Sequence, residues 1–162
     1  MHRLYEYGDI AVFWDSDKCR HRKMCVTGSP RTFEFGRRPW IDLTKAPTAE
    51  IWETISKCPT GALSCVYTHN VTTELDMDNC RSVAFTSSED GVRQQTGECD
   101  FKKTEEGWTI YHTEVAPEFE GKGIAKRLVY RLVEAAEREG AQIIPVCSYA
   151  KRVLDAGEGR AQ

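Results

Sequence analysis

The segment VAPEFEGKGIAKRLV, residues 115–129, decides how the second half of the chain folds. The run WTIYHTEV (108–115) alternates and predicts a strand, whereas apolar residues continue at helical spacing up to residue 136. Gly140 ends that helix, and QIIPVC (142–147) predicts the next strand. Strand, glycine loop, helix and strand in this order predict a βαβ crossover, which we expect to be right-handed.

The loop of this segment favours an anion. Its backbone N–H groups converge at the helix N-terminus, where the helix dipole favours negative charge. Gly121 and Gly123 let the backbone approach a phosphate closely. Three basic side chains stand nearby, Lys122, Lys126 and Arg127. The chemistry suggests a pyrophosphate site, against the alternative that the glycines only allow the helix to pack closely on the strand.

The spacing V-x-P from Val115, followed by G-x-G-x-A from Gly121, resembles the acetyl-CoA loop of the GCN5-related N-acetyltransferases. HTEV…GKGIAKRLV together with IIPVCSYA is similar to the minimal YjdJ-type subfamily, over about residues 78–155. The resemblance implies a mixed α/β fold in which CoA lies between the strand at Val115 and the strand at 143–147. It also implies that the backbone around residues 114–116 polarises the thioester carbonyl. The residues that it assigns to acetyl-CoA are Val115, Ala116, Glu120, Gly121, Lys122, Gly123, Ile124, Ala125, Lys126 and Arg127.

The chain departs from this family at three points. Glu120 stands where the family usually has Arg or Gln, and a carboxylate beside a pyrophosphate is unfavourable unless it points away. The runs 81–86, 92–103 and 108–115 predict a meander of three strands, without room for the two helices that usually shape the acceptor site. We therefore expect an acceptor site that is open or completed by the first half of the chain. Only AGEGRAQ follows Asp155, so the last helix is expected to be short or absent.

Acetylation of an amine needs a base for the ammonium and an acid for the departing CoA thiolate. His112 and Glu114 lie on one face of the strand that leads into the loop and are candidate bases. Tyr149 is a candidate acid, and Cys147 is a candidate acyl-accepting nucleophile. The alternatives are a surface role for His112 and a core role for Cys147.

The first half of the chain predicts a small ββαβ-like unit. Strands are expected at IAVFW (10–14), TFEF (32–35) and 62–67. A helix is expected over 48–57, capped by its first residue and ended by the Cys-Pro pair that follows. A unit of about 65 residues buries too little apolar surface to be very stable alone, so a metal site would help to stabilise it.

Cysteines supply the ligands for such a site. The bacterial iron–sulfur pattern C-x2-C-x2-C with a distant C-P fits Cys19, Cys25 and Cys58, with Arg22 where the second cysteine would stand. Three thiolates fit a three-iron cluster, or a four-iron cluster whose last iron takes another ligand, for which His21 is the nearest candidate. Zinc on the same residues and simple buried thiols are the alternatives.

The stretch DKCRHRKMCVTGSPRTFEF, with the later PWI and CPTGAL, resembles the divergent single-cluster ferredoxin-like family, as in small YjdI-type bacterial proteins. It also resembles the three-iron ferredoxins, which keep C-x5-C and a C-P-x-G-A pattern. The resemblance covers about residues 5–67 and implies an iron–sulfur cluster, 4Fe–4S or 3Fe–4S. The expected metal ligands are Cys19, Cys25 and Cys58, with His21 as the candidate fourth ligand, against the alternative of a hydrogen-bond donor to the cluster or a solvated loop residue. For Cys65 we expect a structural role.

Composition narrows the class of protein. A net charge of −3 with 40% hydrophobic residues is ordinary for a globular protein and gives no general case for nucleic-acid binding. MHRLYEYGDI lacks the apolar core of a signal peptide, and no run approaches the ~20 apolar residues of a membrane span. We therefore expect a cytoplasmic protein whose seven cysteines are thiols or ligands. The polar stretch 67–75 predicts a linker between domains at 1–68 and 76–162.

These observations predict an α/β (α+β) protein with a ferredoxin-like module and a minimal acetyltransferase-like module. The leading function is an iron–sulfur N-acetyltransferase that binds acetyl-CoA and acetylates an amine or protein acceptor. One alternative is an acetyl-CoA-binding redox sensor without turnover. The other is a ferredoxin-type electron carrier with a redox partner.

Overall fold

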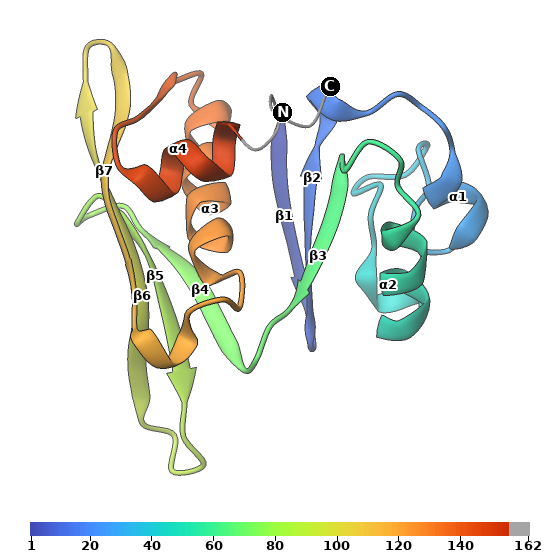
Figure 1. The fold of residues 1–162 in the computed structure, drawn as a ribbon, viewed down its shortest axis with the longest axis horizontal. Coiled ribbons are helices and arrows are strands. Elements are labelled where there is room, and N and C mark those ends of the chain that lie inside the picture. The colour runs from blue at the N-terminus through green and yellow to red at the C-terminus, as the bar shows by residue number, and fades with distance from the viewer. Residues whose placement is uncertain (156–162) are drawn as a thin grey trace. The chain divides into compact units, whose positions relative to one another are not determined.

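The computed structural model describes residues 1–155 and divides into two compact units (Figure 1). The first unit spans Met1–Thr68, and the second begins at His69. Within the described residues each unit has its own sheet, of three strands in the first and five in the second. Each unit also carries helices, which confirms the predicted mixed α/β class.

The first unit is built on an antiparallel sheet in the order β1-β2-β3. Its strands are β1 (His2–Tyr7), β2 (Ile10–Asp15) and β3 (Leu63–Tyr67). Its helices are α1 (Met24–Gly28) and α2 (Thr48–Ser56), with 3-10 turns at Ser16–Lys18 and Leu43–Lys45. The central strand β2 is buried throughout. The core of the unit is formed by Ile10, Val12, Trp14, Phe33, Ile41, Leu43, Ile51, Ile55, Ala62 and Leu63.

The second strand of the predicted ββαβ-like unit differs in the structure. The predicted strand at 32–35 is wrong, because Phe33 forms only a single bridge with Ile41. Turns shape this segment instead, and the Ser29 carbonyl accepts two backbone N–H groups. Strand β2 pairs with β1 on one side and β3 on the other, and Gly8 at φ +58° allows the two-residue turn that joins β1 to β2.

Helix α2 carries the chain to the third cysteine of the candidate metal site. Pro47 occupies its N-cap, and the Thr48 hydroxyl bonds to the Asp9 carboxylate of the β1–β2 turn, so the predicted cap at Thr48 is wrong. The helix stops before Cys58-Pro59, as predicted from the effect of proline on the residue before it.

The second unit contains a sheet in the order β4-β5-β6-β7-β8. Its strands are β4 (Val71–Asp76), β5 (Arg81–Ser87), β6 (Arg93–Thr104), β7 (Gly107–Val115) and β8 (Ile143–Pro145). Its helices are α3 (Ile124–Arg138) and α4 (Ser148–Asp155), with a 3-10 turn at Pro117–Phe119. Strands β4 to β7 form an antiparallel meander. Strand β8 pairs with β7 in parallel, so β7, α3 and β8 form the predicted βαβ crossover.

Helix α3 covers one face of this sheet (Figure 1). Leu128 and Leu132 are fully buried, and they belong to the same core as Cys99, Phe101 and Ile110 of β6 and β7. Because side chains alternate along a strand, Glu98 and Asp100 of β6 and His112 and Glu114 of β7 lie on the opposite face. That opposite face carries the polar residues that are considered below.

The polar segment 67–75 is not the predicted linker. Its residues from Val71 onward pair with β5 along the whole of β4. The composition is polar because β4 is an edge strand, with Val71 and Thr73 buried and their alternate neighbours exposed. The meander therefore has one strand more than the three that were predicted.

The last helix was predicted to be short or absent, and α4 extends over Ser148–Asp155. The AGEGRAQ segment, 156–162, lies outside the described residues. Within residues 1–155, no helix combines the length and the apolar character that crossing a membrane requires.

Candidate functional sites

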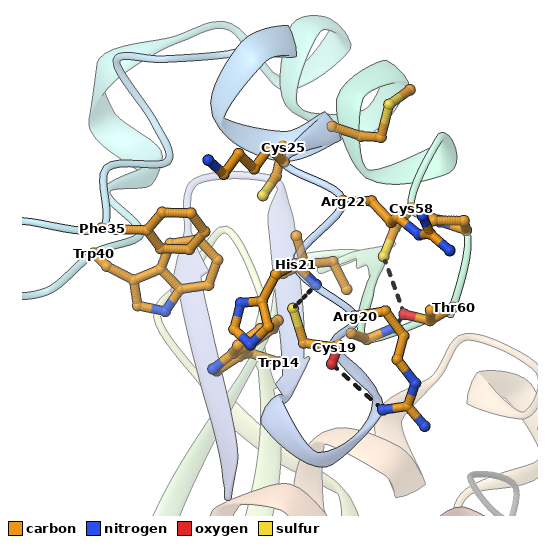
Figure 2. A pocket seen from close by; sticks show the side chains of 15 residues that line it. Trp14, Cys19, Arg20, His21, Arg22, Cys25, Phe35, Trp40, Cys58 and Thr60 are labelled. Atoms are coloured by element: carbon orange, nitrogen blue, oxygen red, sulfur yellow. Dashed lines mark hydrogen bonds between the residues drawn. The ribbon is translucent and has the colours of Figure 1, made fainter.

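Three cysteines of the first unit line one hollow (Figure 2). Cys19 lies just after β2, Cys25 lies in α1, and Cys58 follows α2. Their sulfur atoms point toward the same space in Figure 2. The fold thus brings together thiols that come from two separate sequence motifs.

The loop between Cys19 and Cys25 is curled by two residues with left-handed backbone, His21 at φ +55° and Lys23 at φ +63°. This curl turns the backbone N–H of His21 toward Cys19, whose Sγ accepts it at 3.4 Å. His21 and Arg22 also line the hollow, and Figure 2 shows the His21 ring beside Cys19. Positive φ is uncommon outside glycine, so two such residues in one loop mark a specific conformation.

Cys58 lies in an environment that favours its thiolate. Burial raises the pKa of the Cys58 thiol, but backbone N–H groups of the CPTGAL turn and the Thr60 hydroxyl together lower it by more than burial raises it. The net pKa lies below the ordinary value of a cysteine. The thiolate is the form that binds metals, so this turn favours the form of Cys58 that coordination would need.

Cys25 has a pKa shift in the opposite direction. Burial raises the pKa of its thiol, and the charges of Cys58 and Cys19 raise it as well, while backbone N–H donors act against them. Thiolates this close repel one another until a cation lies between them. This behaviour is typical of a set of metal ligands.

Aromatic side chains border the hollow. Trp40 packs edge-on against Trp14, with 4.8 Å between ring centroids, and Phe35 stacks on Trp40 at 5.3 Å. Apolar surroundings of this kind limit the access of water to a metal site. Cys65 does not line the hollow and packs against the core from β3, in the structural position expected for it.

In the second unit, strands β7 and β8 pair over a short stretch and then separate. The three pairs are Trp108–Ile143, Thr109–Ile144 and Ile110–Pro145. Both Val146 and Cys147 then donate their N–H groups to the Ile110 carbonyl, at 2.9 and 3.0 Å, before the chain turns into α4. Residues 111–115 of β7 continue without pairing to β8.

This open edge of β7 presents backbone groups of Thr113 and Val115. The Ala116 N–H donates to the Thr96 carbonyl at 2.7 Å, on the β6 side. Backbone groups alternate between the two edges of a strand, so the N–H of Val115 points away from β6. It faces the gap that opens where β8 leaves β7.

The glycine loop lies at the N-terminus of α3. Gly121 and Gly123 have φ of +77° and +76°, and Gly123 is the N-cap. The Arg127 N–H donates to the Gly123 carbonyl, so the N–H groups ahead of Arg127 have no partner within the helix. A side chain at Gly121 would meet no atom within 4 Å, and Glu120 is exposed.

Arg127 does not lie with the loop at the surface. Its side chain is fully buried, and its guanidinium donates to the Val71 carbonyl at 2.6 Å. This contact ties α3 to the edge strand β4. A cation in this position does not reach a ligand at the loop, and helical spacing alone could not distinguish it from Lys126.

His112 and Glu114 share the outer face of the sheet with two acidic residues that sequence reasoning missed, Glu98 and Asp100. The β6–β7 register pairs Glu98 with Glu114 and Asp100 with His112. The Nε2 of His112 lies 3.4 Å from Glu114 Oε2 and 3.9 Å from Glu98 Oε1. Burial raises the pKa of Asp100, and the charge of Glu98 raises it further.

Cys147 lies on the other side of β7. Its Sγ is 3.2 Å from the Thr113 hydroxyl, and Thr113 alternates with His112 along the strand and faces the core. The fold therefore separates the candidate nucleophile from the candidate bases. Tyr149 is half-buried at the start of α4, where the Arg152 guanidinium lies 5.1 Å from the centre of its ring.

Fold and sites together define a two-part protein, with a thiol-lined hollow in one unit and a sheet whose parallel strands β7 and β8 separate in the other. Residues 5–68 match the family described as divergent 4Fe-4S mono-cluster, and residues 84–159 match the GCN5-related N-acetyl-transferase family. The chain belongs to the divergent 4Fe-4S mono-cluster family and carries a GCN5-related N-acetyltransferase domain after it.

Relatives of the first unit include the uncharacterized protein YjdI of Escherichia coli, from strain K12 and from O157:H7. Each is 34% identical over 62 residues, which cover 38% of this chain and 82% of the relative. Among solved structures, a GCN5-like protein from Staphylococcus aureus, determined by NMR in solution, is similar with a TM-score of 0.40. Its sequence identity is 23%, and the match covers 57% of this chain and 86% of that protein.

Proposed function

We propose that this chain is a cytoplasmic iron–sulfur N-acetyltransferase that takes acetyl-CoA as donor and an amine as acceptor. The observation that carries the proposal is the separation of β7 from β8 after Ile110. The open backbone edge of β7 leads within a few residues into the glycine loop of α3. One ligand with a thioester and a pyrophosphate can use both features.

The loop binds the pyrophosphate in this proposal. The N–H groups at the start of α3 donate to phosphate oxygens, and the left-handed glycines keep side chains away from them. Lys122 and Lys126 supply positive charge. Arg127 is excluded from this role by its burial. Glu120 is exposed, which allows its carboxylate to point away from the phosphates.

The Val115 N–H polarises the thioester carbonyl and stabilises the oxyanion that forms during the transfer. The acceptor first gives a proton to His112 or Glu114 and then attacks the carbonyl carbon as a neutral amine. The C–S bond breaks, and the CoA thiolate leaves and takes a proton, for which Tyr149 is the candidate donor. Because Cys147 and His112 lie on opposite sides of β7, direct transfer is favoured over an acetyl-cysteine intermediate.

In the first unit we propose a four-iron cluster held by Cys19, Cys25 and Cys58, with His21 at the fourth iron. When bound, the cluster supplies one-electron redox chemistry. The residues around it stabilise the thiolates through N–H donors and exclude water with the aromatic wall. A three-iron cluster on the three thiolates alone is the alternative.

Purification without oxygen, iron and sulfide assays, and electron paramagnetic resonance test the cluster. We expect about four irons per chain and a signal that appears only after reduction. A signal that is present in the oxidised protein and vanishes on reduction would establish three irons and remove His21 from the ligands. Cys58→Ala should lose the iron, whereas Cys65→Ala, which lies outside the hollow, should keep it. Zinc in place of iron would contradict the cluster.

Titration calorimetry with acetyl-CoA tests the second unit, and acetyl-CoA consumption with an amine tests turnover. Binding without consumption would favour a second candidate, an acetyl-CoA-binding redox sensor. That candidate is supported by the exposure of Arg20, His21 and Arg22 around the cysteine hollow, which makes the site accessible to oxidants or to a redox partner.

A further inference from the structure

We propose that the outer face of β6 and β7 binds a cationic primary amine between Glu98 and Glu114, and that this amine is the acetyl acceptor. The identification as acceptor rests on the function proposed above. We call this surface the acidic face. It is formed by Thr96, Glu98, Asp100, His112, Glu114 and Ala116, which share one side of the β6–β7 ladder.

A hollow lies at one end of the acidic face. Its lining residues are Gln95, Thr96, Gly97, Glu98, Glu114 and Ala116. Thr96 is only 2% exposed, and among the described residues its hydroxyl oxygen is buried without a hydrogen-bond partner. A buried hydroxyl without a partner is unfavourable, so a polar ligand atom in the hollow would be stabilised by it.

The charge around the hollow is negative. Glu98 is only 25% exposed at its side chain, and Glu114 stands opposite it in the ladder. Among the described residues the guanidinium on Glu98 is that of Arg81 at 3.4 Å, and Arg81 also pairs with Asp76 at 3.2 Å. One cation shared in this way leaves the acidic face with unbalanced carboxylates. A primary ammonium carries three N–H donors, which match two carboxylates and one hydroxyl.

The position of the hollow suits the reaction. Glu114 and Ala116, which line it, are the neighbours of Val115, whose N–H we assign to the thioester. Glu114 lines the hollow and can take a proton from an ammonium there, and the Nε2 of His112 lies 3.4 Å from its Oε2. The ammonium gives one proton to Glu114, the nitrogen lone pair forms the new C–N bond as the C–S bond breaks, and the second proton that the nitrogen loses balances the one that the CoA thiolate takes. Glu98 binds the substrate and does not take part in the bond changes.

A divalent cation is the rival ligand, because Glu98, His112 and Glu114 bring three ligand atoms within 4.8 Å. The hollow itself favours the amine, since His112 does not line it and the polar side chains beside its two carboxylates are the neutral ones of Gln95 and Thr96. Arg81 on Glu98 also occupies an oxygen that a metal ion would use.

Titration calorimetry of the intact, cluster-loaded protein with 1,4-diaminobutane, without acetyl-CoA, tests the site. We expect Glu98→Gln to weaken binding about tenfold or more, and Thr96→Val to weaken it severalfold. The matched control is Glu105→Gln, an exposed carboxylate on the β6–β7 turn, which should bind as the native protein does. In acetyl transfer, Glu98→Gln should raise KM for the diamine about tenfold and change kcat by less than about twofold.

Equal binding by Glu98→Gln and Glu105→Gln, or no binding of the diamine at millimolar concentration, would overturn the proposal. The proposal would also be overturned if one equivalent of Mn²⁺ displaced the diamine and the binding of Mn²⁺ depended on Glu98 and His112. The two proposals fail separately. If the diamine binds in a way that depends on Glu98 but the protein does not bind acetyl-CoA, the amine site is supported and the transferase function is contradicted. If the protein acetylates another acceptor and does not bind the diamine, the transferase function is supported and the amine site is contradicted.

Discussion

The backbone N–H of His21 donates to the Sγ of Cys19 at 3.4 Å, and the φ of +55° at His21 makes this contact possible. In the proposed cluster this contact supports the Cys19 sulfur through the main chain, so it does not depend on the imidazole. The imidazole remains available for the fourth iron of the proposed cluster. Backbone support and side-chain ligation by His21 can therefore be separated by substitution.

His21→Asn should convert the four-iron cluster to a three-iron cluster. Asparagine tolerates the left-handed conformation, so the loop and its N–H contact are expected to persist while the fourth ligand is lost. The paramagnetic signal should then appear in the oxidised protein, and the iron content should fall by about one quarter. His69→Asn is the matched control, because His69 also has positive φ and lies outside the hollow. Identical spectra for the two variants would show that the His21 ring is not a ligand.

Gly121→Glu should abolish acetyl-CoA binding, since it places a carboxylate in the proposed pyrophosphate site at a residue with φ +77°. Gly91→Glu is the control. Gly91 has φ +78° in the β5–β6 turn, and a side chain at either glycine meets no atom within 4 Å. Both variants should therefore lose similar stability to backbone strain, of about 1–2 kcal/mol. Calorimetry should find that only Gly121→Glu loses the ligand, and equal affinities would mean that the loop is not the phosphate site.

The parts of the fold that could be predicted from the sequence are those with a strong period. The helix after residue 123 has a regular apolar stripe, and β7 alternates clearly between buried and exposed residues. The crossover from β7 to β8 was therefore predicted correctly. The edge strands β1 and β4 were missed because an edge strand of an antiparallel sheet has one solvated face and few buried residues. The stretch 32–35 alternates like a strand, but turns around Ser29 shape it instead.

The candidate sites show the same division. Local motifs pointed to Cys19, Cys25 and Cys58, and the fold brings these three thiols to one hollow. Glu98 could not be found in this way, because only the β6–β7 register brings it to Glu114. The sequence pattern also does not show how deeply a side chain is buried. Arg127 was therefore predicted to act with the loop lysines, although its guanidinium is buried.

Alkaline pH should destabilise the second unit through Cys99. Burial raises the pKa of this thiol to about 12, against an ordinary value of 9.0. A folded-state pKa above the unfolded one gives a contribution to stability that is complete below about pH 9 and is lost as the pH rises toward 12. Each pH unit in this window corresponds to about 1.4 kcal/mol. Between pH 8 and pH 10.5 the native protein should therefore lose about 2 kcal/mol more than Cys99→Ala, since the loss begins near pH 9.

Urea denaturation of both proteins at the two pH values measures this difference. Other groups that titrate in the same range are common to the two chains, so their contributions cancel in the difference between the two free energies of unfolding. The cavity that Cys99→Ala creates lowers stability at both pH values and also cancels. A constant difference between the two proteins would show that the Cys99 thiol ionises in the folded state as easily as in the unfolded one.

Arg127→Met should lower stability and leave acetyl-CoA affinity nearly unchanged. The guanidinium bonds to the Val71 carbonyl in the core, and methionine would leave that carbonyl without this donor, at a cost of about 1.5–3 kcal/mol. Lys126→Met is the comparison, one residue earlier and half-exposed near the loop. It should weaken acetyl-CoA binding, increasingly so at low salt, with little change in melting temperature. The opposite pattern, with affinity lost in Arg127→Met and stability retained, would mean that Arg127 leaves the core to bind the ligand and that β4 is held by other contacts.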